Sequence, residues 1–139
     1  MKALGMDLGT KTLGLATSDK SGLISSPYKT IRYETIDELV DIVIKLIDEL
    51  HIEELVLGLP KNMNNTSGPA AERSLAFKSA LESKIDMEVH LVDERLSTVE
   101  ATNVLLDYDM SRKKRKQVVD SIAASIILDT YLRMKRKEN

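Results

Sequence analysis

The chain has 139 residues, of which 42% are hydrophobic and 30% charged, and this composition suits one soluble domain, spanning 1–139, with a single core. It contains no cysteine, which excludes disulfides and thiolate metal sites. Its apolar runs fall well short of the ~20 residues that span a bilayer, and the acid at position 7 comes too early for a signal peptide. We therefore expect a cytoplasmic protein with no membrane partner.

The net charge of -2 conceals an asymmetry. Residues 111–139 hold nine basic and three acidic side chains, a net charge of +6, whereas the preceding 110 residues sum to −8. Basic segments often contact phosphate backbones, so the C-terminal segment is a candidate nucleic-acid contact. A solvated helix end or a charged tail is the alternative explanation.

The predicted elements begin with three strands. Short apolar segments at 2–8 and 12–18 flank a glycine turn and predict a β-hairpin. A third strand at about 23–33 mixes β-branched and aromatic residues with Pro27, which predicts an edge or irregular strand.

Helices and strands then alternate. Thr35 can cap the first helix, with Glu38 as its capping-box partner. The expected elements are a helix to Leu50, a strand at 54–59, a loop at 61–69, a helix at 70–83, a strand at 87–92, a helix from Ser97 to Tyr108, a basic loop, and a helix at 117–134. This order predicts an α/β fold with a mixed five-stranded sheet, antiparallel on one side, parallel on the other and flanked by helices.

Asp7 ends the first strand of the hairpin, just before the turn at Gly9 and Thr10. Nucleases and phosphotransferases need a carboxylate in such a place, held on rigid backbone to bind a metal or face a phosphate. A turn aspartate that caps Gly9 and Thr10 would give the same pattern, so Asp7 alone leaves both interpretations open.

Further acids follow the last strand, as Asp93 and Glu94, and lie on the last helix, as Asp120. Asp120 shares a helix face with apolar positions such as Ala124 and Leu128. A carboxylate facing the core costs several kcal/mol unless it meets a cation, a metal or solvent. The alternative is that Asp120 caps the start of the helix, where a carboxylate favours the helix dipole.

Strand ends and a helix start can converge at one rim of a sheet, where several carboxylates would repel one another. Mg²⁺ or Mn²⁺ would relieve that repulsion because hard cations prefer oxygen ligands, and two such ions can activate water for phosphodiester cleavage. The only histidines are His51, at a helix end, and His90, in a strand, which makes zinc a poor candidate. The spacing supports no Ser-His-Asp arrangement.

Candidate contacts to a phosphate backbone occur in several places. Arg95 follows the acid pair and is suited either to contact a phosphate or to hold the carboxylates. The loop after Pro60 presents Lys61 and Asn62, although plain turn chemistry also explains it. The remaining candidates are Lys11 in the hairpin turn and the run Arg112, Lys113, Lys114, Arg115 and Lys116.

These motifs resemble the YqgF/RuvX family over nearly the whole chain. In order, they are Asp7-Leu8-Gly9-Thr10-Lys11 with Gly14, Gly58-Leu59-Pro60, Gly68, Asp93-Glu94-Arg95-Leu96-Ser97-Thr98 with Glu100-Ala101, and Asp120-Ser121-Ile122-Ala123-Ala124. The Asp-Glu-Arg-Leu-Ser-Thr block is the most specific of them. The resemblance implies an RNase H-like fold related to RuvC-type resolvases, and a metal-dependent nuclease of the bacterial cytoplasm.

The resemblance also implies a catalytic site. Its acids would be Asp7, Glu94 or its neighbour Asp93, and Asp120, with Mg²⁺ or Mn²⁺ held by Asp7, Glu94 and Asp120. The implied activity is endonucleolytic 5′-end processing of pre-16S rRNA, and the alternative is resolution of Holliday junctions. The implied partners are structured RNA or branched DNA and pre-ribosomal particles. Monomer and homodimer both stay open, and a symmetric junction substrate would favour the dimer.

Two other classes of function are weighed against a nuclease. The Asp7 hairpin resembles the phosphate-binding segment of actin-like sugar or acid kinases, but these place ATP between two such domains and this chain has room for one. A non-catalytic nucleic-acid-binding or ribosome-assembly module would keep the fold, although unused clustered carboxylates would cost stability.

Overall fold

The structure is a computed structural model that describes residues 1–60, 68–93 and 112–138. The side chains of 112–118, 137 and 138 are not described. The described residues contain five strands and three helices. In order they are β1 (Ala3–Leu8), β2 (Thr12–Ser18), β3 (Ser25–Arg32), α1 (Ile36–Leu50), β4 (Glu54–Leu59), α2 (Pro69–Glu82), β5 (Val89–Asp93) and α4 (Arg112–Glu138). The predicted order is confirmed for these elements, and the helix expected from Ser97 to Tyr108 lies outside the described residues.

The strands form one mixed sheet in the order β3-β2-β1-β4-β5. β2 pairs antiparallel with β1 and with β3, while β4 pairs parallel with β1 and with β5. The predicted mixed sheet is therefore confirmed. β3 is an edge strand, and its Pro27 lies opposite Ala16, next to a register shift between Leu15 and Ala16, where a missing N–H costs least.

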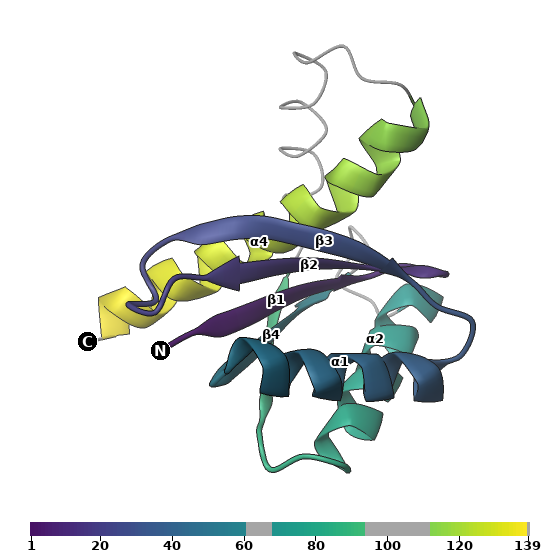
Figure 1. Cartoon of the computed structure of the whole chain (residues 1–139), viewed down its shortest axis with the longest axis horizontal. Coiled ribbons are helices and arrows are strands. Elements are labelled where there is room, and N and C mark those ends of the chain that lie inside the picture. Colours follow the sequence, from purple (N-terminus) through teal and green to yellow (C-terminus); the bar gives the residue numbers. More distant parts are fainter. Residues whose placement is uncertain (61–67, 94–111, 139) are drawn as a thin grey trace.

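The helices cover both faces of this sheet: α1 and α2 lie on one face, and α4 crosses the other (Figure 1). Successive side chains of a strand point to opposite faces, so each strand contributes to both layers. Large residues such as Leu4, Met6 and Leu57 pack toward α1 and α2. Smaller ones, such as Ala3 and Ala16, pack toward α4 and let this helix approach the sheet closely.

The ends of α1 and α2 follow from local sequence. The Thr35 hydroxyl oxygen accepts a hydrogen bond from the Glu38 N–H at 3.2 Å, as the capping motif predicts. His51 ends α1 in the left-handed conformation, with φ of 56°. Gly68 precedes α2 and Pro69 occupies its first turn, where a missing N–H costs no intrahelical bond.

The prediction of a basic loop before a helix at 117–134 is wrong. α4 begins at Arg112 and continues to Glu138, so the run Arg112–Lys116 is helical backbone. Arg and Lys are good helix formers, and no Gly or Pro interrupts the run. In Figure 1 the first part of α4 stands clear of the sheet, and the rest lies across it. Across the described ranges, no helix, α4 included, has the apolar length that crossing a membrane requires.

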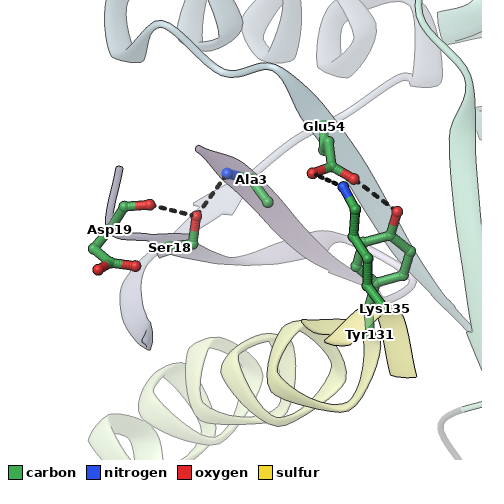
Figure 2. A network of polar contacts seen from close by, with 6 residues as sticks. All are labelled: Ala3, Ser18, Asp19, Glu54, Tyr131 and Lys135. Carbon is green, nitrogen blue, oxygen red and sulfur yellow. Dashed lines mark hydrogen bonds and ion pairs between the residues drawn. The ribbon is translucent and has the colours of Figure 1, made fainter. Parts of the chain in front are cut away.

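A buried carboxylate holds the C-terminal half of α4 against the sheet (Figure 2). Glu54, at the start of β4, accepts hydrogen bonds from the Tyr131 hydroxyl at 2.7 Å and from the Lys135 ammonium at 2.5 Å. Burial by itself raises the pKa of Glu54, but the bonds from Lys135 and Tyr131 outweigh it and hold that pKa below its ordinary value. The ionised carboxylate therefore binds the C-terminal half of α4 to the start of β4, in addition to the apolar contacts of this helix with the sheet.

Candidate active site

Asp7 faces α4. It alternates on β1 with Ala3 and Gly5. Ala3 is buried between the sheet and α4, in what is called the α4 layer below. An added Cβ on Gly5 would lie 2.7 Å from the Cβ of Leu128 on α4. Residues two apart on a strand share a face, so the half-buried carboxylate of Asp7 points to the side of the sheet that α4 covers. The predicted hairpin with an acid at the end of its first strand is confirmed.

Gly14 brings α4 to this acid. It is the register partner of Asp7 on β2. A Cβ built on Gly14 would lie 2.1 Å from the carbonyl oxygen of Asp120 and 3.0 Å from its Cβ, so the helix backbone rests directly on the glycine. Asp7 and Asp120, 113 positions apart in sequence, are thus placed on the same face of the sheet beside the same pair of strands.

Thr12 orients the second acid. Its hydroxyl donates a hydrogen bond to Oδ2 of Asp120 at 3.0 Å. Asp120 lies well inside α4, which starts at Arg112, so the alternative in which Asp120 caps the helix start is wrong. The face predicted for α4 is confirmed, because Ala123, Ala124, Ile127 and Leu128 are buried and Asp120, at the end of that stripe, is half-buried.

The β1–β2 turn is fixed by its own backbone and by Tyr33. The Gly9 N–H donates to the Thr12 carbonyl at 2.7 Å, so the backbone, not the Asp7 side chain, accepts this bond. The Tyr33 N–H donates to the Lys11 carbonyl at 3.0 Å, and the Tyr33 hydroxyl donates to the Gly9 carbonyl. Burial raises the pKa of Tyr33, partly offset by the charge of Arg73, so this hydroxyl keeps its proton through the neutral range.

A pocket of about 270 Å³ lies where this turn meets α4. It is lined by Gly9, Thr10, Lys11, Thr12, Arg32 and Asp120. A carboxylate, two hydroxyls and two cationic side chains therefore converge on one cavity, a composition that suits a phosphate ester approaching an acidic site.

Asp93 points the other way. Val89 belongs to the α1/α2 layer, the core between the sheet and these two helices. Val92 belongs to the α4 layer on the other face. Asp93, the exposed last residue of β5, follows Val92 and so lies on the face opposite Asp7. The structure sets Asp7 and Asp120 on one face of the sheet beside Gly14, and Lys11 lines the same pocket as Asp120. It places Asp93 on the opposite face.

Other predicted residues fall outside the description. Glu94, Arg95, Lys61 and Asn62 are outside the described residues, and the run from Arg112 to Lys116 is described as helical backbone without its side chains. The sequence interpretation named Gly14 as part of the family motif but not as the contact of α4, and it missed Thr12 and Arg32 beside Asp120 and Tyr33 behind the turn. The only signal for these three in the sequence was their place in or next to the strands that follow the Asp7 turn.

The two described acids suit a hard cation. Asp7 and Asp120 offer oxygen donors only, the kind that Mg²⁺ and Mn²⁺ prefer. Neither histidine lies beside these acids. His90 packs on Tyr131, with 5.2 Å between the ring centroids, and Tyr131 lies eleven residues after Asp120 on α4. His51 ends α1. Within residues 1–60, 68–93 and 112–138, no three His, Asp or Glu side chains cluster as metal ligands.

The fold defines a class of protein. RuvC of Thermus thermophilus in complex with a Holliday junction substrate aligns with 98% of this chain and 96% of its own, with a TM-score of 0.58 and 12% identity. The resolvase of Fowlpox virus with its substrate Holliday junction DNA aligns with 97% of this chain and 99% of its own, with a TM-score of 0.55 and 12% identity. The fold is therefore that of the RuvC-like resolvases, an RNase H-like fold.

The sequence identifies the family within this class. A family model described as "RuvX: Holliday junction resolvase" matches residues 1–134, and the chain belongs to this family. A relative from Halothermothrix orenii is 44% identical over 99% of this chain and 98% of its own length. One from Geobacillus sp. is 47% identical over 98% and 100%. Both bear the name "Putative pre-16S rRNA nuclease".

Proposed function

We propose that this chain is a metal-dependent endonuclease that hydrolyses phosphodiester bonds in 5′-end processing of pre-16S rRNA. The observation that carries the proposal is the contact of the Asp120 backbone with Gly14, which sets a second carboxylate beside the strand pair that bears Asp7. The names of relatives that are 44–47% identical over nearly the full length support the substrate.

Asp7 and Asp120 would hold Mg²⁺ or Mn²⁺. When bound, the ion supplies an activated water and neutralises charge that develops on the phosphate. Asp7 contributes a carboxylate on a central strand, whose position is fixed by pairing on both sides. Thr12 donates a hydrogen bond to Oδ2 of Asp120, which orients that carboxylate.

The third ligand is best assigned to Glu94. Asp93, the other candidate, lies on the face of the sheet opposite Asp7, which argues against it as the ligand. Asp93→Asn should then leave cleavage nearly intact, whereas Glu94→Gln should abolish it.

The substrate backbone would be guided by Lys11 and by the basic run Arg112–Lys116. Lys11 lines the pocket beside Asp120, and the basic run Arg112–Lys116 forms the first part of α4, about one to two turns before that acid. Both would lower the electrostatic cost of bringing a polyanion to an acidic site. Residues 1–139 would act as one domain in the cytoplasm, as a monomer or a homodimer on pre-ribosomal particles.

Resolution of Holliday junctions is the second candidate, because the description of the family model favours it. A two-fold symmetric junction would require two active sites, so this function needs a dimer.

One experiment separates the two candidates. The wild type and Asp7→Asn are incubated with a pre-16S rRNA 5′-leader fragment and with a four-way DNA junction, each with Mg²⁺, with Mn²⁺ and with EDTA. We expect metal-dependent cleavage of the leader by the wild type and none by Asp7→Asn. Cleavage of the junction alone would move the assignment to the second candidate, and cleavage of both substrates by Asp7→Asn would refute the proposed site.

A further inference from the structure

Arg32 is placed at the acidic site by strand register. It is the last residue of β3 and pairs with Thr12 on β2. Directly paired residues of antiparallel strands point to the same face of the sheet. Thr12 points toward α4, since its hydroxyl binds Asp120, and Arg32 therefore shares the face on which that acid lies.

Arg32 and Lys11 line one cavity. Both line the pocket of about 270 Å³ that Asp120 also lines. Both side chains are exposed, and within the described part of the chain neither forms an ion pair. Two cations that share a pocket repel each other, so this arrangement favours an anion between them.

The backbone that carries both cations is fixed. Tyr33, the residue after Arg32, donates its N–H to the Lys11 carbonyl and its hydroxyl to the Gly9 carbonyl. The strand end that carries Arg32 is thereby bound to the turn that carries Lys11. A pair of cations on a preorganised scaffold loses less conformational entropy on binding than two side chains on a mobile loop.

We propose, resting on the nuclease function above, that Arg32 with Lys11 binds a backbone phosphate of the substrate next to the phosphodiester that is cleaved. A guanidinium offers two parallel N–H donors to phosphate oxygens, which a lysine ammonium cannot reproduce. Arg32 thus sets the position of the substrate strand relative to Asp120 and Asp7 and acts in binding, while the acids act in the chemical step.

Binding can be measured without turnover in the Asp7→Asn background. The affinity of a fluorescent pre-16S rRNA leader fragment and of a four-way DNA junction is followed by anisotropy between 0.05 and 0.3 M salt, ranges typical of such titrations. Arg32→Ala should weaken binding about five- to eightfold at ~0.1 M salt and reduce the slope of log K against log salt by about 0.7–0.9, as expected when one phosphate contact is lost.

Lys29→Ala is the matched control. Lys29 lies on the same strand and carries the same charge, but it pairs with Leu15, whose side chain is buried in the α1/α2 layer, and its ammonium lies 5.3 Å from the ring centroid of Tyr28. Lys29→Ala should leave unchanged both the affinity for the nucleic acid and the slope of log K against log salt. Arg32→Lys should keep the slope and recover only part of the affinity, because the charge remains and the paired donors are lost.

The outcomes separate this inference from the proposed function. An unchanged slope in Arg32→Ala, or an equal change in Lys29→Ala, would overturn the phosphate contact even if the wild type cleaves. A wild type that binds but never cleaves would overturn the nuclease function, while a reduced slope in Arg32→Ala would still support the contact. In an active wild type, Arg32→Ala should raise KM about fivefold with kcat within about twofold, and a fall in kcat alone would contradict a binding role.

Discussion

Gly14→Ala tests whether the contact between α4 and the hairpin creates the site. The added Cβ would lie 2.1 Å from the Asp120 carbonyl oxygen and 2.4 Å from its carbonyl carbon, whereas real Cβ contacts below 3.0 Å essentially do not occur. The helix must therefore retreat from β2 by about 1 Å. Such overpacking costs about 1–3 kcal/mol of unfolding free energy, and a displacement of ~1 Å at reacting groups can cost about 10²-fold in rate.

Gly5→Ala is the control for that variant. Its added Cβ would meet the Cβ of Leu128 at 2.7 Å and the carbonyl oxygen of Ala124 at 2.9 Å, so it crowds the same helix about one to two turns beyond Asp120. Urea denaturation should show losses of similar size in both variants. Cleavage of the leader fragment, per folded molecule, should fall about 10²-fold only in Gly14→Ala. Equal rates in the two variants, or a wild-type rate in Gly14→Ala, would refute the reasoning.

Three further changes probe the hydrogen bonds that orient Asp120, the β1–β2 turn and α4. Thr12→Val removes the donor to Asp120 and should lower kcat about tenfold, equivalent to ~1.4 kcal/mol, with a small loss of stability; an unchanged kcat would contradict its orienting role. Tyr33→Phe should lower the unfolding free energy by about 1 kcal/mol, measured in urea, because the Gly9 carbonyl loses its donor. Glu54→Gln should lower the unfolding free energy by about 1–2 kcal/mol at pH 7, because Lys135 loses its charged partner. Because the pKa of Glu54 is lowered in the folded state, the wild type should exceed Glu54→Gln in unfolding free energy by the full amount above pH 4.5, the ordinary pKa of Glu. This difference should vanish as the pH falls through the folded-state pKa. A difference that grows in acid would disprove the assignment.

The hairpin and the sheet could be predicted because their signals are local. Alternating apolar residues on either side of Gly9 specify two strands and a turn, and Pro27 marks an edge. The extent of α4 could not be predicted in the same way. A run of five basic residues also occurs in solvated loops, and the weak helix preference of Arg and Lys did not outweigh that interpretation even though no Gly or Pro interrupts the run.

The neighbours of Asp7 depend on contacts between distant segments. Nothing local distinguishes Gly14, on which α4 rests, from a glycine that merely shapes a turn. Arg32 reaches the acidic site through its pairing with Thr12 across a strand register that the sequence does not specify. Asp93 and Glu94 are adjacent in sequence, and only the layers to which Val89 and Val92 belong show which face Asp93 takes.

The measurement that tests the account most directly is the metal-dependent cleavage rate of the leader fragment by Asp7→Asn, Asp120→Asn and Asp93→Asn, each at saturating Mg²⁺ and Mn²⁺. The two acids on the α4 face should each be needed for cleavage. The cleavage rate should therefore fall about 10³-fold or more in Asp7→Asn and in Asp120→Asn, equivalent to ~4 kcal/mol of transition-state stabilisation. Asp93→Asn, on the opposite face, should stay within a few-fold of the wild type. Retained cleavage by Asp120→Asn, or an equal loss in all three variants, would contradict a site built from Asp7 and Asp120.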